Sequence, residues 1–147
     1  MLIVDSREKK WLHIKKYLDN KGYEYEVRAL DTGDYMNEDM PGVIIDRKQN
    51  LNEVCQNLCS RDNNRFWREI RRSKKEGVQL IVLVEHGGKI KAMRDVAGWK
   101  NKYSSISGTR LLEEMYRVEV AYGVKWMFCC KQKTPSLILE LLGLNKS

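Results

Sequence analysis

The chain has 147 residues, of which 42% are hydrophobic and 32% charged, a balance that indicates a folded domain and excludes a disordered chain. Its 27 lysines and arginines exceed its 20 aspartates and glutamates, and the net charge of +7 favours a polyanionic partner such as nucleic acid. The longest apolar run, residues 80–84, is far shorter than the ~20 residues that span a membrane, so we expect an intracellular protein without a membrane anchor.

The first third of the chain reads as alternating strands and helices. Residues 2–4 form an apolar strand ending at Asp5, and apolar residues then recur at helical spacing from 11 to 18, before a C-cap at Gly22. Residues 23–29 alternate between apolar and polar as a half-exposed strand does, and the turn that follows leads into a short strand at 34–36. We predict that these two strands form a hairpin.

The central third continues the pattern. An apolar strand at 43–45 runs into a charged triplet, residues 46–48, and helices are predicted at 51–58 and 64–76. The apolar run that begins at residue 79 reads as a buried strand.

The last third predicts a mobile loop at 98–108, a helix at 111–122, a strand at 124–129 and a final helix with Thr134 as its N-cap. The alternation predicts an α/β fold, and we expect a single domain over residues 1–147.

Four cysteines, at positions 55, 59, 129 and 130, have neither the spacing of a disulfide framework nor that of a structural zinc site. We expect reduced thiols that are mostly buried.

Three charged residues around the second and third strands suggest chemistry. Asp34 opens one strand, Asp46 ends the next, and Lys48 lies two positions further, where the period of a strand points it to the same side as Asp46. Two carboxylates and a lysine form the minimum set for metal-dependent phosphodiester hydrolysis. Taken alone, the same residues also fit a turn cap and an exposed ion pair worth less than ~1 kcal/mol.

Five motifs in register carry a more specific signal. They are Ile3-Val4-Asp5-Ser6-Arg7-Glu8, Thr32-Gly33-Asp34-Tyr35, Val43-Ile44-Ile45-Asp46-Arg47-Lys48, Asn64-Arg65-Phe66 and Leu83-Val84-Glu85. In this order and at these intervals the chain resembles the nuclease domain of the XPF/Hef family of structure-specific endonucleases. The resemblance implies a restriction-endonuclease-like fold of the PD-(D/E)XK superfamily, with a central mixed sheet flanked by helices on both faces.

The resemblance also implies roles for individual residues. Asp34 and Asp46 would bind Mg²⁺ or Mn²⁺, Lys48 would assist the attacking water, and Arg47 would hold the scissile phosphate or the geometry of the site. Asp5 would add a further acidic residue to the catalytic and metal site, with Glu8 beside it. Arg7 would contact DNA.

Two positions depart from the family pattern. Asp46 stands where the family has glutamate, which shortens the arm of a metal-competent carboxylate, and Asn52 stands where the family has aspartate. Asn52 could coordinate a metal through its amide oxygen, whereas Glu53 is turned away from it by about 100° on a helix. We expect no helix-hairpin-helix module, which family members carry, within residues 1–147.

A row of arginines, Arg61, Arg65, Arg68 and Arg72, shares one face of the helix predicted at 64–76 and of the residues just before it. Such a row can follow a phosphate backbone, and the resemblance favours DNA contact. Glu69 and Glu76 each lie four residues after an arginine, so intrahelical pairing on a solvated face is the alternative.

The final helix is apolar nearly all round. We expect it either to pack into the domain's own core or to pair with a second copy or a partner subunit.

The functional hypothesis is therefore a Mg²⁺- or Mn²⁺-dependent endonuclease that cuts branched, flap or otherwise structured DNA. The alternative is a catalytically silent DNA-binding or dimerisation module that retains the nuclease fold. The sequence does not separate DNA from RNA as the substrate.

Overall fold

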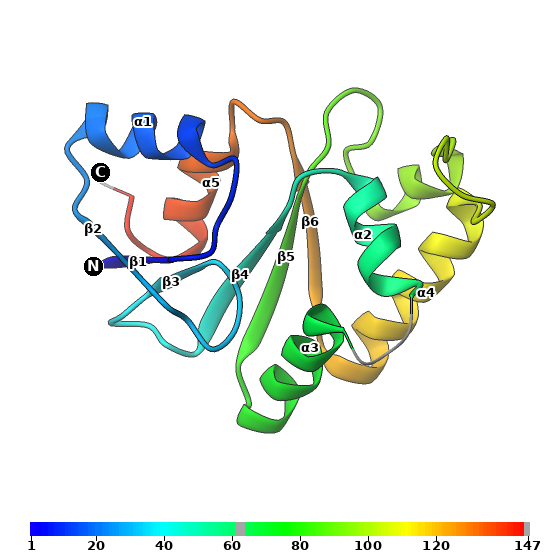
Figure 1. The fold of residues 1–147 in the computed structure, drawn as a ribbon, viewed down its shortest axis with the longest axis horizontal. Helices are drawn as coiled ribbons and strands as arrows, with labels where there is room; N and C mark the ends of the chain where they lie inside the picture. Colours follow the sequence, from blue (N-terminus) through cyan, green and yellow to red (C-terminus); the bar gives the residue numbers. More distant parts are fainter. Residues whose placement is uncertain (61–63, 146–147) are drawn as a thin grey trace.

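A six-stranded mixed sheet forms the centre of the molecule in a computed structural model that describes residues 1–60 and 64–145 (Figure 1). The strand order is β2-β1-β3-β4-β5-β6, and β3 runs antiparallel to both of its neighbours while the other pairs are parallel. The strands are β1 (Leu2–Asp5), β2 (Tyr25–Arg28), β3 (Tyr35–Asn37), β4 (Val43–Lys48), β5 (Gln79–Glu85) and β6 (Lys125–Cys129).

Helices cover both faces of the sheet, as Figure 1 shows. One face carries α1 (Leu12–Lys21) and α5 (Thr134–Leu141), and the other carries α2 (Leu51–Leu58), α3 (Arg65–Glu76) and α4 (Gly108–Tyr122), with the short 3-10 helix η1 (Met93–Gly98) before α4. Alternate residues of β4 and β5 supply two separate apolar cores, one on each face. The predicted α/β architecture is confirmed.

Local sequence signals set the ends of the helices. The side chain of Asn50 accepts a hydrogen bond from the backbone N–H of Glu53 at the start of α2, and that of Asn64 accepts one from Trp67 at the start of α3. The helices α1, α3 and α4 end at glycines in the left-handed region, at the positions that the sequence predicted.

The predicted hairpin between residues 23–29 and 34–36 is wrong. Strand β2 pairs in parallel with β1, and β3 pairs antiparallel with the opposite edge of β1, so β1 lies between them. The helix α1 forms a crossover that returns the chain parallel to β1, and such crossovers place the next strand beside the first one. Alternating polarity indicates a strand but does not identify its partner.

The final helix packs mainly into the domain's own core. Ile138, Leu139 and Leu142 are buried against the residues of α1 and the sheet. The N-cap of α5 is Lys133, and Thr134, predicted as the N-cap, is the first residue of the helix. The hydroxyl of Thr134 donates a hydrogen bond to the carboxylate of Glu85. Pairing of this helix with a second chain stays a prediction.

The four cysteines are free thiols, but only Cys55 is buried, while Cys130 is exposed, so the predicted burial was too general. Within residues 1–60 and 64–145, no helix has the length and apolar character needed to cross a lipid bilayer.

Candidate active site

Gly33 and Asp34 sit where the chain passes between β1 and β4. Gly33 has φ +73°, and a Cβ at this position would lie 2.3 Å from Cγ2 of Ile44 and 2.9 Å from the carbonyl oxygen of Ile45. Only glycine fits such a conformation and approach. The backbone N–H of Asp34 donates to the Ile45 carbonyl at 2.8 Å, and its own carbonyl accepts from the N–H of Asp5 at 2.8 Å. The backbone of Asp34 is thereby fixed to both strands.

The alternation of β4 divides its three charged residues between the two faces. Asp46 and Lys48 point toward α2 and α3, where Lys48 Nζ lies 3.5 Å from Asp46 Oδ2. Both side chains are buried, with exposed fractions of 9% and 6% for Lys48 and Asp46. The predicted common side is therefore confirmed, and the alternative of an exposed ion pair is wrong.

Asp34 and Asp46 form a carboxylate pair in which Asp46 is buried and Asp34 is partly buried. Burial raises the pKa of Asp34 well above its ordinary value, the negative charges of Asp46 and Glu8 raise it further, and a 2.8 Å hydrogen bond from the Arg47 backbone N–H to Oδ2 opposes them. Asp46 Oδ2 is buried and has no hydrogen-bond partner within the described part of the chain. A cation between the two carboxylates would relieve their repulsion and satisfy this oxygen.

Around this pair lies an open cavity of about 220 Å³. Its lining includes the acidic residues Glu8, Asp34, Asp46, Glu53 and Glu69 and the basic residues Arg7, Lys9, Lys48 and Arg65. Carboxylate oxygens are ligands for Mg²⁺ and Mn²⁺. Among the residues that the structure describes, no three acidic, histidine or cysteine side chains are arranged to hold a metal together. The two aspartates, with the unpartnered Asp46 Oδ2, are donors that fit such a cation, and water or a phosphate would complete its shell.

Three groups hold the ammonium of Lys48. It donates to Asn57 Oδ1 at 2.7 Å, forms the ion pair with Asp46, and lies 4.1 Å from the centre of the Phe66 ring. Burial alone would lower the pKa of Lys48, but the negative charges of Asp46 and its neighbours outweigh burial and raise it. Lys48 is therefore a fixed cation that can donate to an anionic oxygen and cannot act as a general base near neutral pH.

Arg47 lies on the face of β4 opposite to Asp46 and Lys48, and its hydrogen bonds there fix neighbouring parts of the chain. Its guanidinium donates to Glu8 Oε2 at 2.9 Å, to Glu85 Oε1 at 3.0 Å and to the carbonyl oxygen of Lys9 at 2.6 Å, and its side chain is 1% exposed. With its donors engaged in this way, Arg47 holds the geometry of the site and does not reach a phosphate. The same contact orients Glu8, whose carboxylate borders the cavity.

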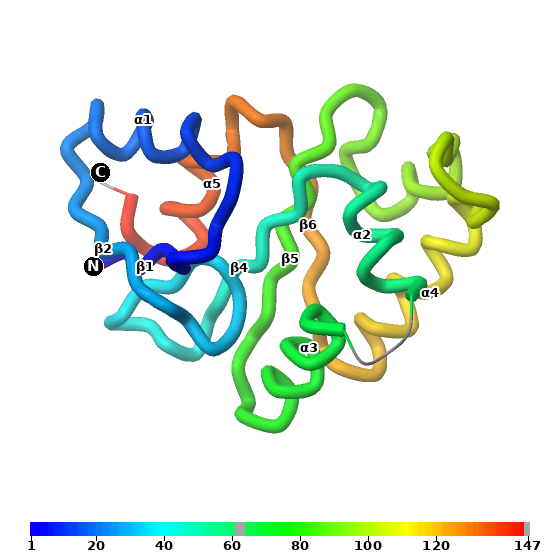
Figure 2. The backbone as a smooth tube through the Cα atoms, in the orientation of Figure 1, coloured from blue at the N-terminus to red at the C-terminus, as the bar shows by residue number. Residues whose placement is uncertain are grey.

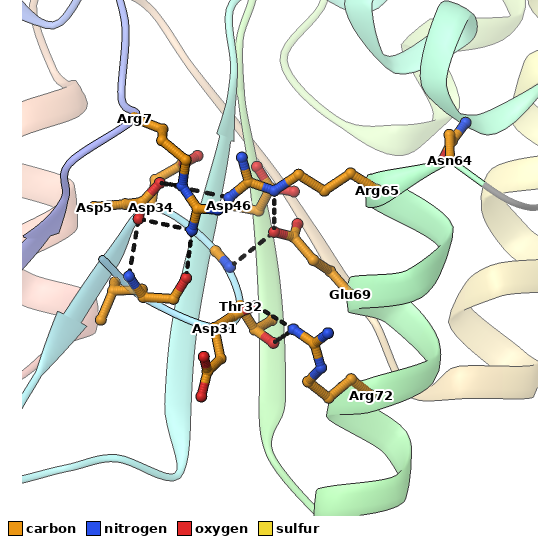
Figure 3. A network of polar contacts seen from close by, with 12 residues as sticks. Asp5, Arg7, Asp31, Thr32, Asp34, Asp46, Asn64, Arg65, Glu69 and Arg72 are labelled. Atoms are coloured by element: carbon orange, nitrogen blue, oxygen red, sulfur yellow. Dashed lines mark hydrogen bonds and ion pairs between the residues drawn. The ribbon is translucent and has the colours of Figure 1, made fainter. Parts of the chain in front are cut away.

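Asp5 lies at the end of β1, as expected, and two arginines and a backbone N–H hold its carboxylate. Its carboxylate accepts from Arg7 at 3.1 and 3.2 Å, from the Leu30 backbone N–H at 2.9 Å and from Arg65 at 3.4 Å (Figure 3). Burial raises the pKa of Asp5, but these hydrogen bonds and the two guanidinium groups outweigh it and lower the pKa. Asp5 does not line the cavity, so its predicted role as a metal ligand is not supported, and it instead anchors two arginines.

The arginines of the predicted row have different contacts and different positions relative to the cavity. Arg65 is 45% exposed, borders the cavity and pairs with Asp5 and Glu69, while Arg72 bonds to the Asp31 carbonyl and to Thr32 (Figure 3). Arg68 is exposed on the same helix. Arg61 lies outside the described residues. The row therefore supplies one arginine to the cavity mouth and others along α3.

Residues 4–142 match the family model described as the ERCC4 domain. The chain belongs to the ERCC4 domain family. This ERCC4 domain is similar in fold to XPF from Aeropyrum pernix, with a TM-score of 0.72 and 21% sequence identity. It is also similar to XPF from the same organism in complex with DNA, with a TM-score of 0.69 and 21% identity.

The ERCC4 domain aligns over 97% of its own residues and spans 63% of the length of either XPF chain. No curated protein sequence matches it. The predicted resemblance to the XPF-type nuclease domain and the predicted restriction-endonuclease-like fold are confirmed.

The structure reverses the expected orientations of Asn52 and Glu53, two residues near the start of α2. Glu53 lines the cavity of the ERCC4 domain and accepts the Gln49 backbone N–H at 3.0 Å. Asn52 faces away, toward Tyr103 in the loop at residues 99–107. Position 53 therefore places a carboxylate at the cavity, and Asn52, which could have coordinated a metal, does not line it.

Glu69, which the sequence indicated only as a pairing partner of an arginine, also lines the cavity. Its Oε1 accepts from Arg65 Nε at 3.1 Å, which confirms the intrahelical pairing, and from the Gly33 backbone N–H at 3.3 Å. The face is nevertheless not solvated, because Glu69 is 5% exposed. Burial raises the pKa of Glu69 to about 7, and the negative charge of Asp46 contributes. Its spacing from Phe66 and Ser73, both buried, could have indicated this orientation.

Asn57 was also missed. It lies on α2, where no charge or motif marks it, and its contact with Lys48 depends on how that helix packs against β4. Its carbonyl oxygen accepts the side-chain N–H of Asn64 at 2.6 Å, so the same residue joins the lysine to the start of α3.

Proposed function

We propose that this ERCC4 domain is a metal-dependent endonuclease that hydrolyses phosphodiester bonds in DNA, with branched or flap-bearing DNA as its substrate. The observation that carries the proposal is the convergence of an aspartate pair and a fixed lysine ammonium in one open cavity. This set provides ligands for a divalent cation and a separate positive charge for the phosphate.

Asp34 and Asp46 would hold Mg²⁺ or Mn²⁺, which prefer carboxylate oxygens over the nitrogen and sulfur ligands of zinc. When bound, such a cation lowers the pKa of a coordinated water and neutralises charge on the phosphate. Lys48, protonated and held by Asn57, would donate to a non-bridging phosphate oxygen or orient the attacking water. Glu53 and Glu69 would add negative charge that strengthens cation binding.

The arginines would position the DNA. Arg7 and Arg65 border the cavity with side chains 51% and 45% exposed, and both are anchored through Asp5. Arg68 and Arg72 would extend the contact along α3, and Arg61 stays a predicted contact. The XPF protein of similar fold has been solved in complex with DNA, which supports DNA as the partner.

Cleavage of flap, fork, bubble and blunt duplex DNA in Mn²⁺ tests the proposal. We expect the wild type to cut a structured substrate, and Asp46→Asn and Lys48→Ala each to reduce the rate by roughly a hundred-fold or more. Asp39→Asn is the matched control, because its side chain is 83% exposed near the N-terminus. Cleavage that survives both site substitutions would contradict the assignment.

Metal binding gives a second readout that separates this function from the silent module. Calorimetric titration with Mn²⁺ should detect a site in the wild type that Asp46→Asn abolishes and Asp5→Asn retains. A protein that binds DNA and nicks none of these substrates in Mn²⁺ would establish the silent DNA-binding module instead. RNA versions of the same substrates test the nucleic-acid preference.

A further inference from the structure

The loop at residues 99–107, between η1 and α4, presents an aromatic ring to solvent beyond the cavity. Figure 2 shows the loop at the edge of the molecule, next to η1 and α4. Tyr103 at its tip is 72% exposed, whereas Trp99 at its base is packed against the core. Its ring offers solvent a flat apolar surface that carries a polar hydroxyl group.

Asn101 holds the loop in one conformation. Its side-chain oxygen accepts the backbone N–H groups of Tyr103 at 2.9 Å and Ser104 at 3.2 Å, and its side-chain nitrogen donates to the Ile106 carbonyl at 2.9 Å. Gly108 closes the loop, because a Cβ there would lie 2.3 Å from the Val96 carbonyl oxygen. These bonds restrain the backbone around Tyr103, so the loop would lose less conformational entropy when a ligand binds there.

Tyr103 stands between two hollows along the start of α2. One, of about 280 Å³, is bordered by Asn50, His86 and Lys102 among others, and the second, of about 190 Å³, is bordered by Gln56 and Ser104 among others. Since Tyr103 borders both, space is open on more than one side of the ring. A planar group can therefore reach a face of the ring without displacing the core.

The described residues give the two hollows no acidic lining, whereas the cavity mixes acidic and basic side chains. Lys100 and Lys102 are exposed, and neither forms an ion pair within residues 1–60 and 64–145. No acidic side chain of the described residues lines either hollow, whereas five line the cavity. An anionic ligand can therefore bind here without a metal ion.

We propose that Tyr103 is a stacking platform for an unpaired nucleobase and that Lys100 and Lys102 bind the phosphates of that single-stranded segment. Bases within a duplex are stacked on one another, so a single strand offers the face that a tyrosine ring needs. Gln49 borders the cavity and Asn50 the first hollow, so one nucleic-acid strand could cross from one to the other. The proposal rests on nucleic acid being the substrate and names the unpaired strand as the feature selected.

Binding in EDTA, where no cleavage occurs, tests the proposal by fluorescence anisotropy on blunt duplex DNA and on the same duplex with a thymidine overhang. Tyr103→Ala should lower the preference for the overhang by about five-fold or more. Tyr103→Phe should keep the preference, because the ring remains. Tyr116→Ala is the matched control, since Tyr116 is 45% exposed on α4.

A second measurement reports stacking directly. 2-Aminopurine in the overhang should lose fluorescence on binding to the wild type and to Tyr103→Phe, and not on binding to Tyr103→Ala. Lys102→Ala should reduce the slope of log affinity against log salt by about one for the overhang substrate, and Lys16→Ala on α1 should not.

The outcomes separate this proposal from the endonuclease proposal. If the wild type cuts DNA but Tyr103→Ala and Tyr116→Ala bind the overhang equally well, the stacking platform is wrong and the catalytic assignment stands. If the wild type cuts nothing but only Tyr103→Ala loses the overhang preference, the platform stands and the catalytic assignment fails.

Discussion

Replacing Glu69 by glutamine should stabilise the metal-free protein at alkaline pH and have little effect at acidic pH. Burial and the nearby charge of Asp46 raise the pKa of Glu69 from 4.5 to about 7, so the folded state binds this proton more tightly than the unfolded state does. The stability that the protonated carboxyl provides is present below pH 4.5 and is lost as the pH rises through about 7.

The magnitude follows from the size of the shift. The interval from 4.5 to about 7 corresponds to roughly 3 kcal/mol of unfolding free energy, because each pKa unit is worth about 1.4 kcal/mol. Glutamine is neutral at every pH and nearly the same size. Its amide oxygen can still accept the Gly33 backbone N–H, so the variant removes the charge and keeps the packing.

Urea unfolding in EDTA at about pH 5 and about pH 8 measures the effect, as a difference between variant and wild type at each pH. Glu76→Gln is the matched control, since Glu76 is exposed on the same helix. The reasoning is refuted if Glu69→Gln changes stability equally at both pH values, or if Glu76→Gln shows the same pH dependence.

Three further predictions follow from the contacts of the site. Asn57→Ala removes the 2.7 Å acceptor of Lys48 and should lower kcat for DNA cleavage by roughly ten- to hundred-fold without changing Mn²⁺ affinity; an unchanged kcat would show that Asn57 does not position the lysine. Gly33→Ala forces a side chain at φ +73° against the β4 backbone and should cost about 2–4 kcal/mol in urea unfolding, whereas Gly87→Ala, with open space around it, should cost much less. Because burial raises the pKa of Asp34, Mn²⁺ must displace a proton from this carboxyl, so the affinity for Mn²⁺ should increase with pH. Calorimetric titrations in buffers of different ionisation enthalpy should detect the released protons. An affinity that does not change with pH would exclude Asp34 as a ligand.

The sequence by itself indicated the strands, most helix ends and the candidate set of Asp34, Asp46 and Lys48. The Gly33-Asp34 pair marks a backbone position that only glycine can take, and the period of two along β4 places Asp46 and Lys48 on one side. These features are local, since they depend on backbone conformation and on the geometry of one element. Local patterns were therefore sufficient to mark the three residues, and five such motifs in register were sufficient to indicate the family.

Only the tertiary structure decided which elements face each other. It placed β1 between β2 and β3, assigned Asp5 to two arginines, and brought Glu69 and Asn57 of two helices to the cavity. A sequence pattern tells which side of a helix or strand a residue occupies, but not which other element covers that side. Contacts between distant segments depend on how the helices pack on the sheet, and for this reason the roles of these residues became clear only in the folded chain.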